Sequence, residues 1–190
     1  MSKDRPTVFE LFAADLLALC RGGWTIGEVT GGAAKLGALV MLFHHGGVRG
    51  TLIHRLAHAA NGRHFRGLPS LLSQLNVALH GIELPASVSI GPGLYMPHTV
   101  GTVINARSIG AHVTLQGGIT IGQKDNTGFP TIGDGVTLAT GCRVLGKITI
   151  GDGAVVGANA VVLHDVPAGA VMVGVPARQV GVTQPDPESG

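Results

Sequence analysis

Histidine is the residue type in this chain best suited to proton transfer near neutral pH, because its unperturbed pKa is about 6.5. Nine histidines are present. For eight of them packing or surface roles are the simpler interpretation, since six lie in a helix-like first part and two at turns of a repeat: His44, His45, His54, His58, His64, His80, His112 and His164. His98 differs because it stands beside a break in that repeat. We therefore take His98 as the candidate general base.

The break can be recognised because the sequence around it repeats every six residues. Between Pro130 and Pro167 one frame contains only aliphatic residues: Ile132, Leu138, Val144, Ile150, Val156 and Val162. The position four residues further on is small or aliphatic in each unit: Val136, Cys142, Ile148, Ala154, Ala160 and Val166. A period of six differs from the 3.6 residues of a helix, so the pattern indicates an internal structural repeat.

Two interruptions divide the earlier part of the repeat. The frame first runs through Leu84, Ile90 and Met96, and then through Val103, Ile109, Leu115 and Ile121. Met96 and Val103 are seven residues apart instead of six, which places a slip beside His98. Ile121 and Ile132 are 11 residues apart, so five extra residues form a predicted loop that contains Gln123 to Phe129.

A six-residue unit has a simple geometric meaning. About four residues of strand at about 3.3 Å each form one flat side, and a two-residue turn leads to the next side. Corners are supplied by Gly-Asp-Gly and Gly-Ala-Asn segments such as 133–135 and 157–159, where a left-handed backbone is needed. Three sides close a coil, so stacked residues should be 18 apart. The sequence predicts a parallel β-helix over residues 82–182.

The first 81 residues have a helical pattern instead. Apolar stripes predict amphipathic helices over residues 3–20, 49–60 and 69–80, with a weaker pattern from Gly31 to Phe43. Residues 183–190 are polar, and we expect a disordered tail there. The predicted organisation is therefore a helical segment (1–81), a β-helix (82–182) and a tail (183–190).

Composition excludes several functional classes. The net charge is +2 and basic residues form no run, which argues against a nucleic-acid partner. Cys20 and Cys142 are far apart in the sequence, and we expect both to be reduced in a cytoplasmic protein. The most apolar run, Leu36 to Phe43, is much shorter than the roughly 20 residues that cross a bilayer. Contact of the N-terminal segment with a membrane surface stays open.

Several segments resemble the serine acetyltransferase family of hexapeptide acyltransferases. They are Pro97-His98-Thr99-Val100-Gly101, Ile150-Gly151-Asp152-Gly153, Val156-Gly157-Ala158-Asn159 and Val173-Gly174-Val175-Pro176-Ala177-Arg178. The resemblance covers roughly residues 50–182. It implies a left-handed β-helix, a homotrimer with active sites in grooves between subunits, and an O-acetyltransferase that uses acetyl-CoA and no metal.

The resemblance also assigns roles to individual residues. His98 matches the catalytic histidine, and Glu83 stands 15 residues upstream, where the family has an aspartate that orients the ring. Gly122, Thr140 and Ala158 match positions along the pantetheine arm of the acyl donor, and Arg178 matches the nucleotide end: these four form the expected acetyl-CoA site. For Gly122 and Ala158 a simple turn role is equally consistent with the sequence.

The acceptor site departs from the family pattern. Serine-using members carry an aspartate directly before the histidine and an Arg-His pair in the loop, whereas this chain has Pro97, Gly128 and Phe129. Because a free amino acid needs partners for both of its charges, we expect a sugar hydroxyl, as in exopolysaccharide-type members, with L-serine as the alternative. The chain ends in Glu188-Ser189-Gly190, without the terminal isoleucine that docks into cysteine synthase, so we expect no such complex.

Two other classes stay open. A zinc-dependent β-helix enzyme would need three converging histidines, two of them five residues apart, and no pair near the repeat has this spacing. A non-catalytic β-solenoid that only binds a partner would have the same repeats. The sequence does not identify the acceptor, the pairing of trimers or the role of the helical segment.

Overall fold

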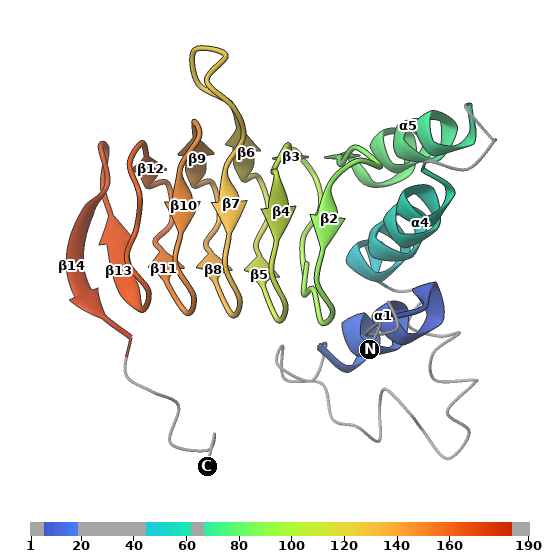
Figure 1. The fold of residues 1–190 in the computed structure, drawn as a ribbon, viewed down its shortest axis with the longest axis horizontal. Helices are drawn as coiled ribbons and strands as arrows, with labels where there is room; N and C mark the ends of the chain where they lie inside the picture. Colours follow the sequence, from blue (N-terminus) through green and yellow to red (C-terminus); the bar gives the residue numbers. More distant parts are fainter. Residues whose placement is uncertain (1–5, 19–44, 62–66, 184–190) are drawn as a thin grey trace, which may run out of the picture.

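Three helices and fourteen short strands make up the part of the chain that the computed structural model describes, residues 6–18, 45–61 and 67–183 (Figure 1). The helices are α1 (Val8–Leu17), α4 (Gly46–Ala60) and α5 (Leu68–His80). The strands are β1 (Ile82–Glu83), β2 (Ser89–Ile90), β3 (Thr102–Ile104), β4 (Ser108–Ile109), β5 (Thr114–Leu115), β6 (Thr120–Gly122), β7 (Thr131–Ile132), β8 (Thr137–Leu138), β9 (Arg143–Leu145), β10 (Thr149–Ile150), β11 (Val155–Val156), β12 (Val161–Val162), β13 (Ala170–Val173) and β14 (Arg178–Val182).

The strands form three sheets that are the three sides of a parallel β-helix. The first sheet has the order β1-β3-β6-β9-β12, the second β2-β4-β7-β10 and the third β5-β8-β11-β13-β14. All pairs are parallel except β13 with β14, which closes the last coil as an antiparallel pair. The predicted fold class, a parallel β-helix that follows a helical segment, is confirmed.

The spacing between paired residues shows where the coil is regular and where it is not. In the regular part, Thr137 pairs with Val155, 18 residues later, as the six-residue period predicts. Along the first sheet the separations are 20, 17, 23 and 18, from the pairs Ile82–Thr102, Val103–Thr120, Thr120–Arg143 and Arg143–Val161. The 20-residue coil contains His98 and the 23-residue coil contains the extra loop, which rises from the β-helix between β6 and β7 (Figure 1).

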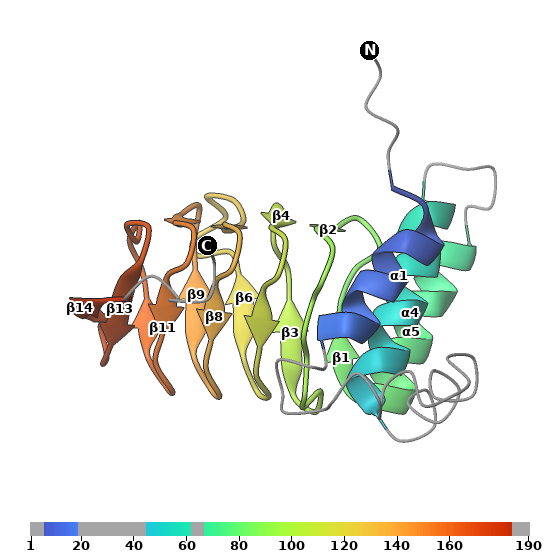
Figure 2. The same ribbon diagram turned by 90° about the horizontal axis from the view of Figure 1, so that it is seen from below.

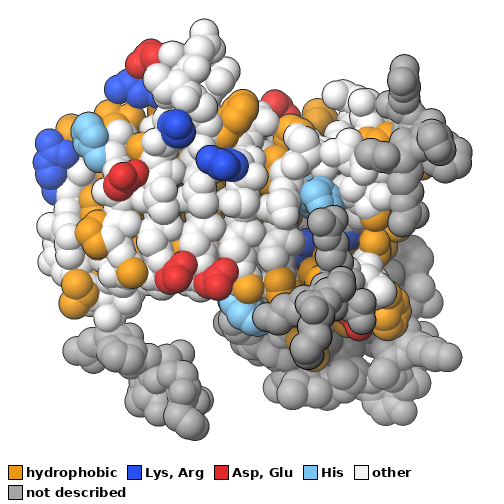
Figure 3. All heavy atoms as spheres, viewed as in Figure 1, with side chains coloured by type: hydrophobic (Ala, Val, Ile, Leu, Met, Phe, Trp, Pro, Cys, Tyr) orange, Lys and Arg blue, Asp and Glu red, His pale blue; other side chains and the backbone are white. Residues whose placement is uncertain are grey.

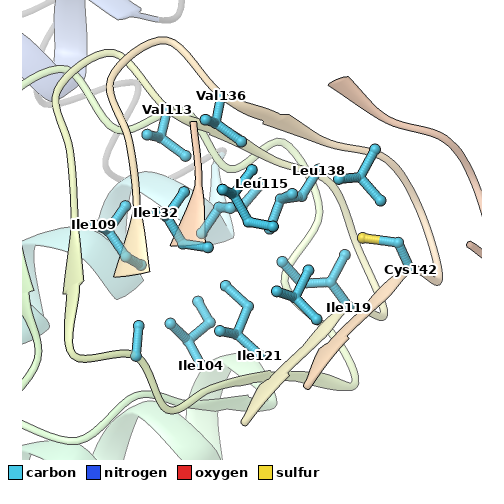
Figure 4. Packing of buried hydrophobic residues seen from close by; sticks show 14 of the residues in the cluster. Ile104, Ile109, Val113, Leu115, Ile119, Ile121, Ile132, Val136, Leu138 and Cys142 are labelled. Atoms are coloured by element: carbon cyan, nitrogen blue, oxygen red, sulfur yellow. The ribbon is translucent and has the colours of Figure 1, made fainter. Parts of the chain in front are cut away.

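Short aliphatic side chains fill the interior of the coils (Figure 4). The residues of the main predicted frame from Ile132 to Val162 are at most 2% exposed, and Cys142 is fully buried, as predicted. One position was predicted wrongly: Val103 is half-buried, and the neighbouring Ile104 points inward with 0% exposure. The reason is the length of the His98 turn, which carries two residues more than a regular coil and so shifts the inward position.

The helices stack side by side against the first coil (Figure 2). Thr7 and Glu10 form a capping box at the start of α1, and Gly81 ends α5 in the left-handed conformation with φ +65°. The predicted helices over 49–60 and 69–80 are confirmed with slightly different ends. The weak pattern from Gly31 to Phe43, Cys20 and residues 184–190 lie outside the described residues.

A buried ion pair fastens the helices to the β-helix. Arg55 on α4 donates from Nε and from one terminal nitrogen to the two carboxylate oxygens of Asp15 on α1, both at 3.0 Å, and both side chains are 3% exposed. The same guanidinium donates to the carbonyls of Ile90 and Gly91, and the backbone N–H of Leu94 donates to Asp15 at 2.8 Å. Two helices and the first coil are therefore joined through a single network.

Two further observations concern Thr183 and the helices. Thr183, which the sequence assigns to the tail, is ordered against the last coil, since its backbone N–H donates to the carbonyl of Gly169 at 2.6 Å. Among the described helices, none is long and apolar enough to cross a bilayer.

Candidate functional site

A column of four residues, one from each of four successive coils, lies along the edge where the third sheet leads into the first. Tyr95, Thr114, Thr137 and Val155 pair in succession, so the residues three positions after each of them also lie in adjacent coils. We call this stack the His98 column: His98, Gly117, Thr140 and Ala158. Neighbouring coils are about 4.8 Å apart, so the column extends about 14 Å from its first residue to its last.

His98 is the exposed head of this column. Its side chain lies over Gly117, where an added Cβ would stand 2.9 Å from the Cβ of His98. Any residue other than glycine at position 117 would therefore crowd the Cβ of His98, from which the imidazole extends. The adjacent turn is closed by a hydrogen bond from the backbone N–H of Thr102 to the carbonyl of Thr99 at 3.2 Å.

The start of α4 supports the His98 turn from the other side. A Cβ at Gly47 would lie 1.8 Å from the carbonyl oxygen of Met96, so the helix backbone contacts the turn directly. Only glycine allows this approach. Sequence reasoning missed both Gly47 and Gly117, because their neighbours come from other coils and helices; the only available signal was the presence of glycine at each position.

Two of the residues expected to bind the acyl donor belong to the same column. Thr140 donates its hydroxyl to Oε1 of Gln116 at 3.0 Å, which holds the threonine side chain along the column. Ala158 follows in the next coil. Arg178 pairs with Val173 at the end of β13, close to the same edge, and donates to the carbonyl of Ala177. A continuous edge thus runs from the imidazole through small side chains to a guanidinium.

Glu83 lies on the first sheet and is exposed. Its carboxylate accepts a hydrogen bond from Nδ2 of Asn105 at 3.3 Å, and no hydrogen bond joins it to His98 in the described part of the chain. It also lines a cavity between α5 and residues 83–87. The single chain therefore holds this carboxylate apart from the imidazole.

The remaining predicted site residues lie at the opposite edge of the first sheet. The residues of the His98 column precede strands β3, β6, β9 and β12, whereas Gly122 ends β6 and the loop follows it. Phe129 is 41% exposed, and nothing lies within 4 Å of a Cβ built on Gly122. The structure thus brings His98, Thr140 and Ala158 together, next to Pro97, and separates them from Gly122, Gly128 and Phe129 within one chain.

Possible metal ligands are dispersed in the described residues, and the described thiol is buried. Across residues 6–18, 45–61 and 67–183 no three histidine, cysteine, aspartate or glutamate side chains are grouped for a metal. Cys142 is fully buried in the coil, and burial raises the pKa of its thiol to about 12, which disfavours the nucleophilic thiolate.

Comparison with known sequences identifies similar proteins. Residues 129–164 match the family model described as bacterial transferase hexapeptide (six repeats). The serine acetyltransferase of Bacillus subtilis is 39% identical over 144 residues, which are 74% of this chain and 66% of that protein. The serine acetyltransferase of Helicobacter pylori J99 is 40% identical over 144 residues, or 74% of this chain and 84% of that protein. The chain thus spans about two thirds of the length of the Bacillus relative.

Solved structures show the same similarity. Soybean serine acetyltransferase complexed with serine superimposes with a TM-score of 0.78 at 31% identity, covering 93% of this chain and 70% of that one. The Neisseria gonorrhoeae enzyme in complex with serine gives a TM-score of 0.80 at 27% identity, covering 92% and 69%.

These relatives contradict one expectation from the sequence. The substitutions at Pro97, Gly128 and Phe129 favoured a sugar acceptor of the exopolysaccharide type, whereas the similar proteins are named serine acetyltransferases. The prediction of a sugar acceptor was wrong. Uncharged residues at three positions show that the charged partners found in serine-using members are missing, but they do not show which other side chains can replace those partners.

Proposed function

We propose, on the premise that this chain belongs to the serine acetyltransferase family of hexapeptide-repeat acyltransferases, that it transfers the acetyl group of acetyl-CoA to the hydroxyl of L-serine. The observation that carries this proposal is the His98 column, in which an exposed imidazole heads a row of small residues. The products would be O-acetyl-L-serine and coenzyme A.

In this proposal His98 moves the proton. An alcohol is a poor nucleophile until its proton is removed, and a neutral imidazole is a suitable base near pH 7. One ring nitrogen of His98 accepts the hydroxyl proton while the serine oxygen bonds to the thioester carbonyl carbon. The carbon–sulfur bond then breaks, and the imidazolium returns the proton to the leaving thiolate. The imidazole is regenerated in the same protonation state.

The column below His98 would hold the acyl donor. Gly117, Thr140 and Ala158 present small or no side chains along a coil edge that extends about 14 Å from His98, so an extended chain can lie against the backbone. Arg178, near the last coil, would meet the phosphates of the nucleotide, because a guanidinium pairs well with phosphate oxygens. Gly122 offers open space for the same ligand at the groove formed with a second subunit.

Further parts of the proposal concern the partners of His98. We assign Glu83 as the carboxylate that orients the imidazole; its Oε1 accepts from Asn105 in the single chain, which leaves Oε2 for the ring. A homotrimer would bring the two edges of the first sheet together from different subunits. A cytoplasmic location belongs to the same proposal.

The test is a thiol-release assay of the purified chain with acetyl-CoA and L-serine, combined with mass spectrometry of the acceptor. We expect coenzyme A release that depends on L-serine and yields O-acetyl-L-serine. Release of coenzyme A with other hydroxyl acceptors, but no acetylation of L-serine, would overturn the proposed acceptor.

A further inference from the structure

An L-serine acceptor poses an electrostatic problem at this site. Its carboxylate must leave water, and a charge without a partner is costly to bury. The side chains of Gly128 and Phe129, at the end of the loop, carry no charge. A cation must therefore come from another part of the surface near the loop.

Lys147 is a cation in contact with the loop. It lies in the turn between β9 and β10, and a Cβ at Gly128 would stand 3.4 Å from its Cβ and Cγ and 3.5 Å from its Cδ. The aliphatic stem of Lys147 thus runs along the backbone of Gly128. With φ +129°, Gly128 has a conformation that L residues rarely adopt, so the loop is built to admit this stem.

The pairing of strands places Lys147 beside Phe129 in the next coil. Thr131 pairs with Thr149, so the residues two positions earlier, Phe129 and Lys147, are also neighbours. Lys147 is exposed and forms no ion pair among the described residues, so its ammonium group is available. Figure 3 shows basic side chains on the edge of the β-helix beneath the loop.

Two other cations near the edges make different contacts. Arg143 directs one guanidinium nitrogen at the carbonyls of Gly118, Gly141 and Cys142, so that nitrogen is already satisfied. Lys124 lies on the other arm of the loop, where its Cβ is 3.5 Å from a Cβ built on Gly146.

Lys147 and His98 cannot serve one acceptor within a single chain. His98 precedes the strands of the first sheet and Lys147 follows β9, so a full side of the β-helix, on the order of 15 Å, separates them. A serine molecule is much shorter than this. The two residues can meet only when the opposite edges of two subunits face each other.

We infer that Lys147 of one subunit binds the carboxylate of the acceptor whose hydroxyl faces His98 of the neighbouring subunit. This inference rests on the proposed function, because only an amino-acid acceptor carries that carboxylate. Lys147 is thus a specificity-determining residue, and it replaces the charge that the loop residues lack.

The first experiment separates the two substrates. In Lys147→Met, kcat/KM for L-serine should fall about 10- to 100-fold, the usual loss for a hydrogen bond to a charged group, while KM for acetyl-CoA stays within about twofold. L-serinamide, which lacks the carboxylate, should be used equally by wild type and variant. Lys147→Arg should keep most of the activity, and Lys124→Met, on the loop itself, is the matched control.

The outcomes distinguish the two proposals. If the wild-type chain does not acetylate L-serine, the proposed function fails and the inference fails with it. If the wild type is active and Lys147→Met has unchanged kcat/KM, or if Lys124→Met loses as much, the assignment of Lys147 alone is overturned.

A mixing experiment tests the two-subunit site. Co-expressed His98→Ala and Lys147→Met chains should form mixed oligomers in which about one quarter of the interfaces hold both native residues, so activity at low L-serine should recover to about one quarter of wild type. Activity no higher than the mean of the two parent variants would overturn the shared site.

Discussion

His98 lies directly over Gly117 of the next coil, so closely that a methyl group on Gly117 would come within 2.9 Å of the Cβ of His98. The two residues are 19 positions apart in sequence, and the pairing of Tyr95 with Thr114 brings them together. The position of the imidazole therefore depends on the absence of a side chain below it.

Removal of the imidazole should abolish most of the activity. In His98→Ala we expect kcat to fall by about 10²- to 10⁴-fold, the range for loss of a positioned general base. The thiol-release assay measures this, and thermal unfolding should show an unchanged melting temperature because His98 is exposed. His164→Ala, at another exposed turn, is the control. Equal activity of His98→Ala and wild type would disprove the assignment of the base.

A displaced imidazole should also slow the reaction, but by less than a missing one. Gly117→Ala places a methyl group against His98, and misplacement of a catalytic group by about 1 Å can cost about 100-fold in rate. We expect kcat to fall about 10- to 100-fold while KM for acetyl-CoA changes little. Gly181→Ala is the matched control, because nothing lies within 4 Å of a Cβ there. Full activity of Gly117→Ala would show that the contact does not position the ring.

The coil and its two interruptions could be predicted from sequence because the repeat is local. Every sixth residue faces inward, so Ile132 and Leu138 identify the period without any knowledge of their partners. The choice between Val103 and Ile104 could not be made in this way, since both are β-branched and the length of the His98 turn decides which one points inward.

The contacts that complete the site depend on long-range pairing. Gly47 meets Met96, a contact that follows no repeat in the sequence, and Gly128 meets Lys147 at the end of the loop that interrupts the repeat. Similarly, Asp15 and Arg55 have the pattern of charged residues on amphipathic helices, and only the packing of α1 on α4 shows that they are buried. The incorrect prediction of the acceptor has the same origin, because the sequence does not show which charged side chains from other coils lie near the loop.

The buried His54 should make stability depend on pH. The ring is 1% exposed, neither nitrogen forms a regular hydrogen bond, and burial lowers its pKa from 6.5 to about 3, against a weak opposing effect of the Val88 backbone. As the pH falls below 6.5, the unfolded chain takes up a proton that the folded chain does not. The free energy of unfolding should therefore decrease by about 1.4 kcal/mol per pH unit between about pH 6 and pH 4.

Replacement of His54 by leucine should remove this dependence. Leucine has no nitrogen to protonate, so the difference in unfolding free energy between His54→Leu and wild type should grow as the pH falls, and at neutral pH the variant should be at least as stable. Urea unfolding at several pH values measures it. His164→Ala, at an exposed position, should keep the wild-type slope. Parallel curves for wild type and His54→Leu would contradict the prediction.

The Asp15–Arg55 pair should control the attachment of the helices to the β-helix. Asp15→Ala leaves the guanidinium buried without its carboxylate, and loss of one partner of a buried pair typically costs about 3–5 kcal/mol. We expect a corresponding decrease in the free energy of unfolding, with faster hydrogen exchange in α1 and α4. Asp15→Leu combined with Arg55→Met should recover part of this loss, since no buried charge remains. Recovery should stay incomplete, because the carbonyls of Ile90 and Gly91 and the N–H of Leu94 lose their partners. If the single and double variants are both as stable as wild type, the network does not hold the helices.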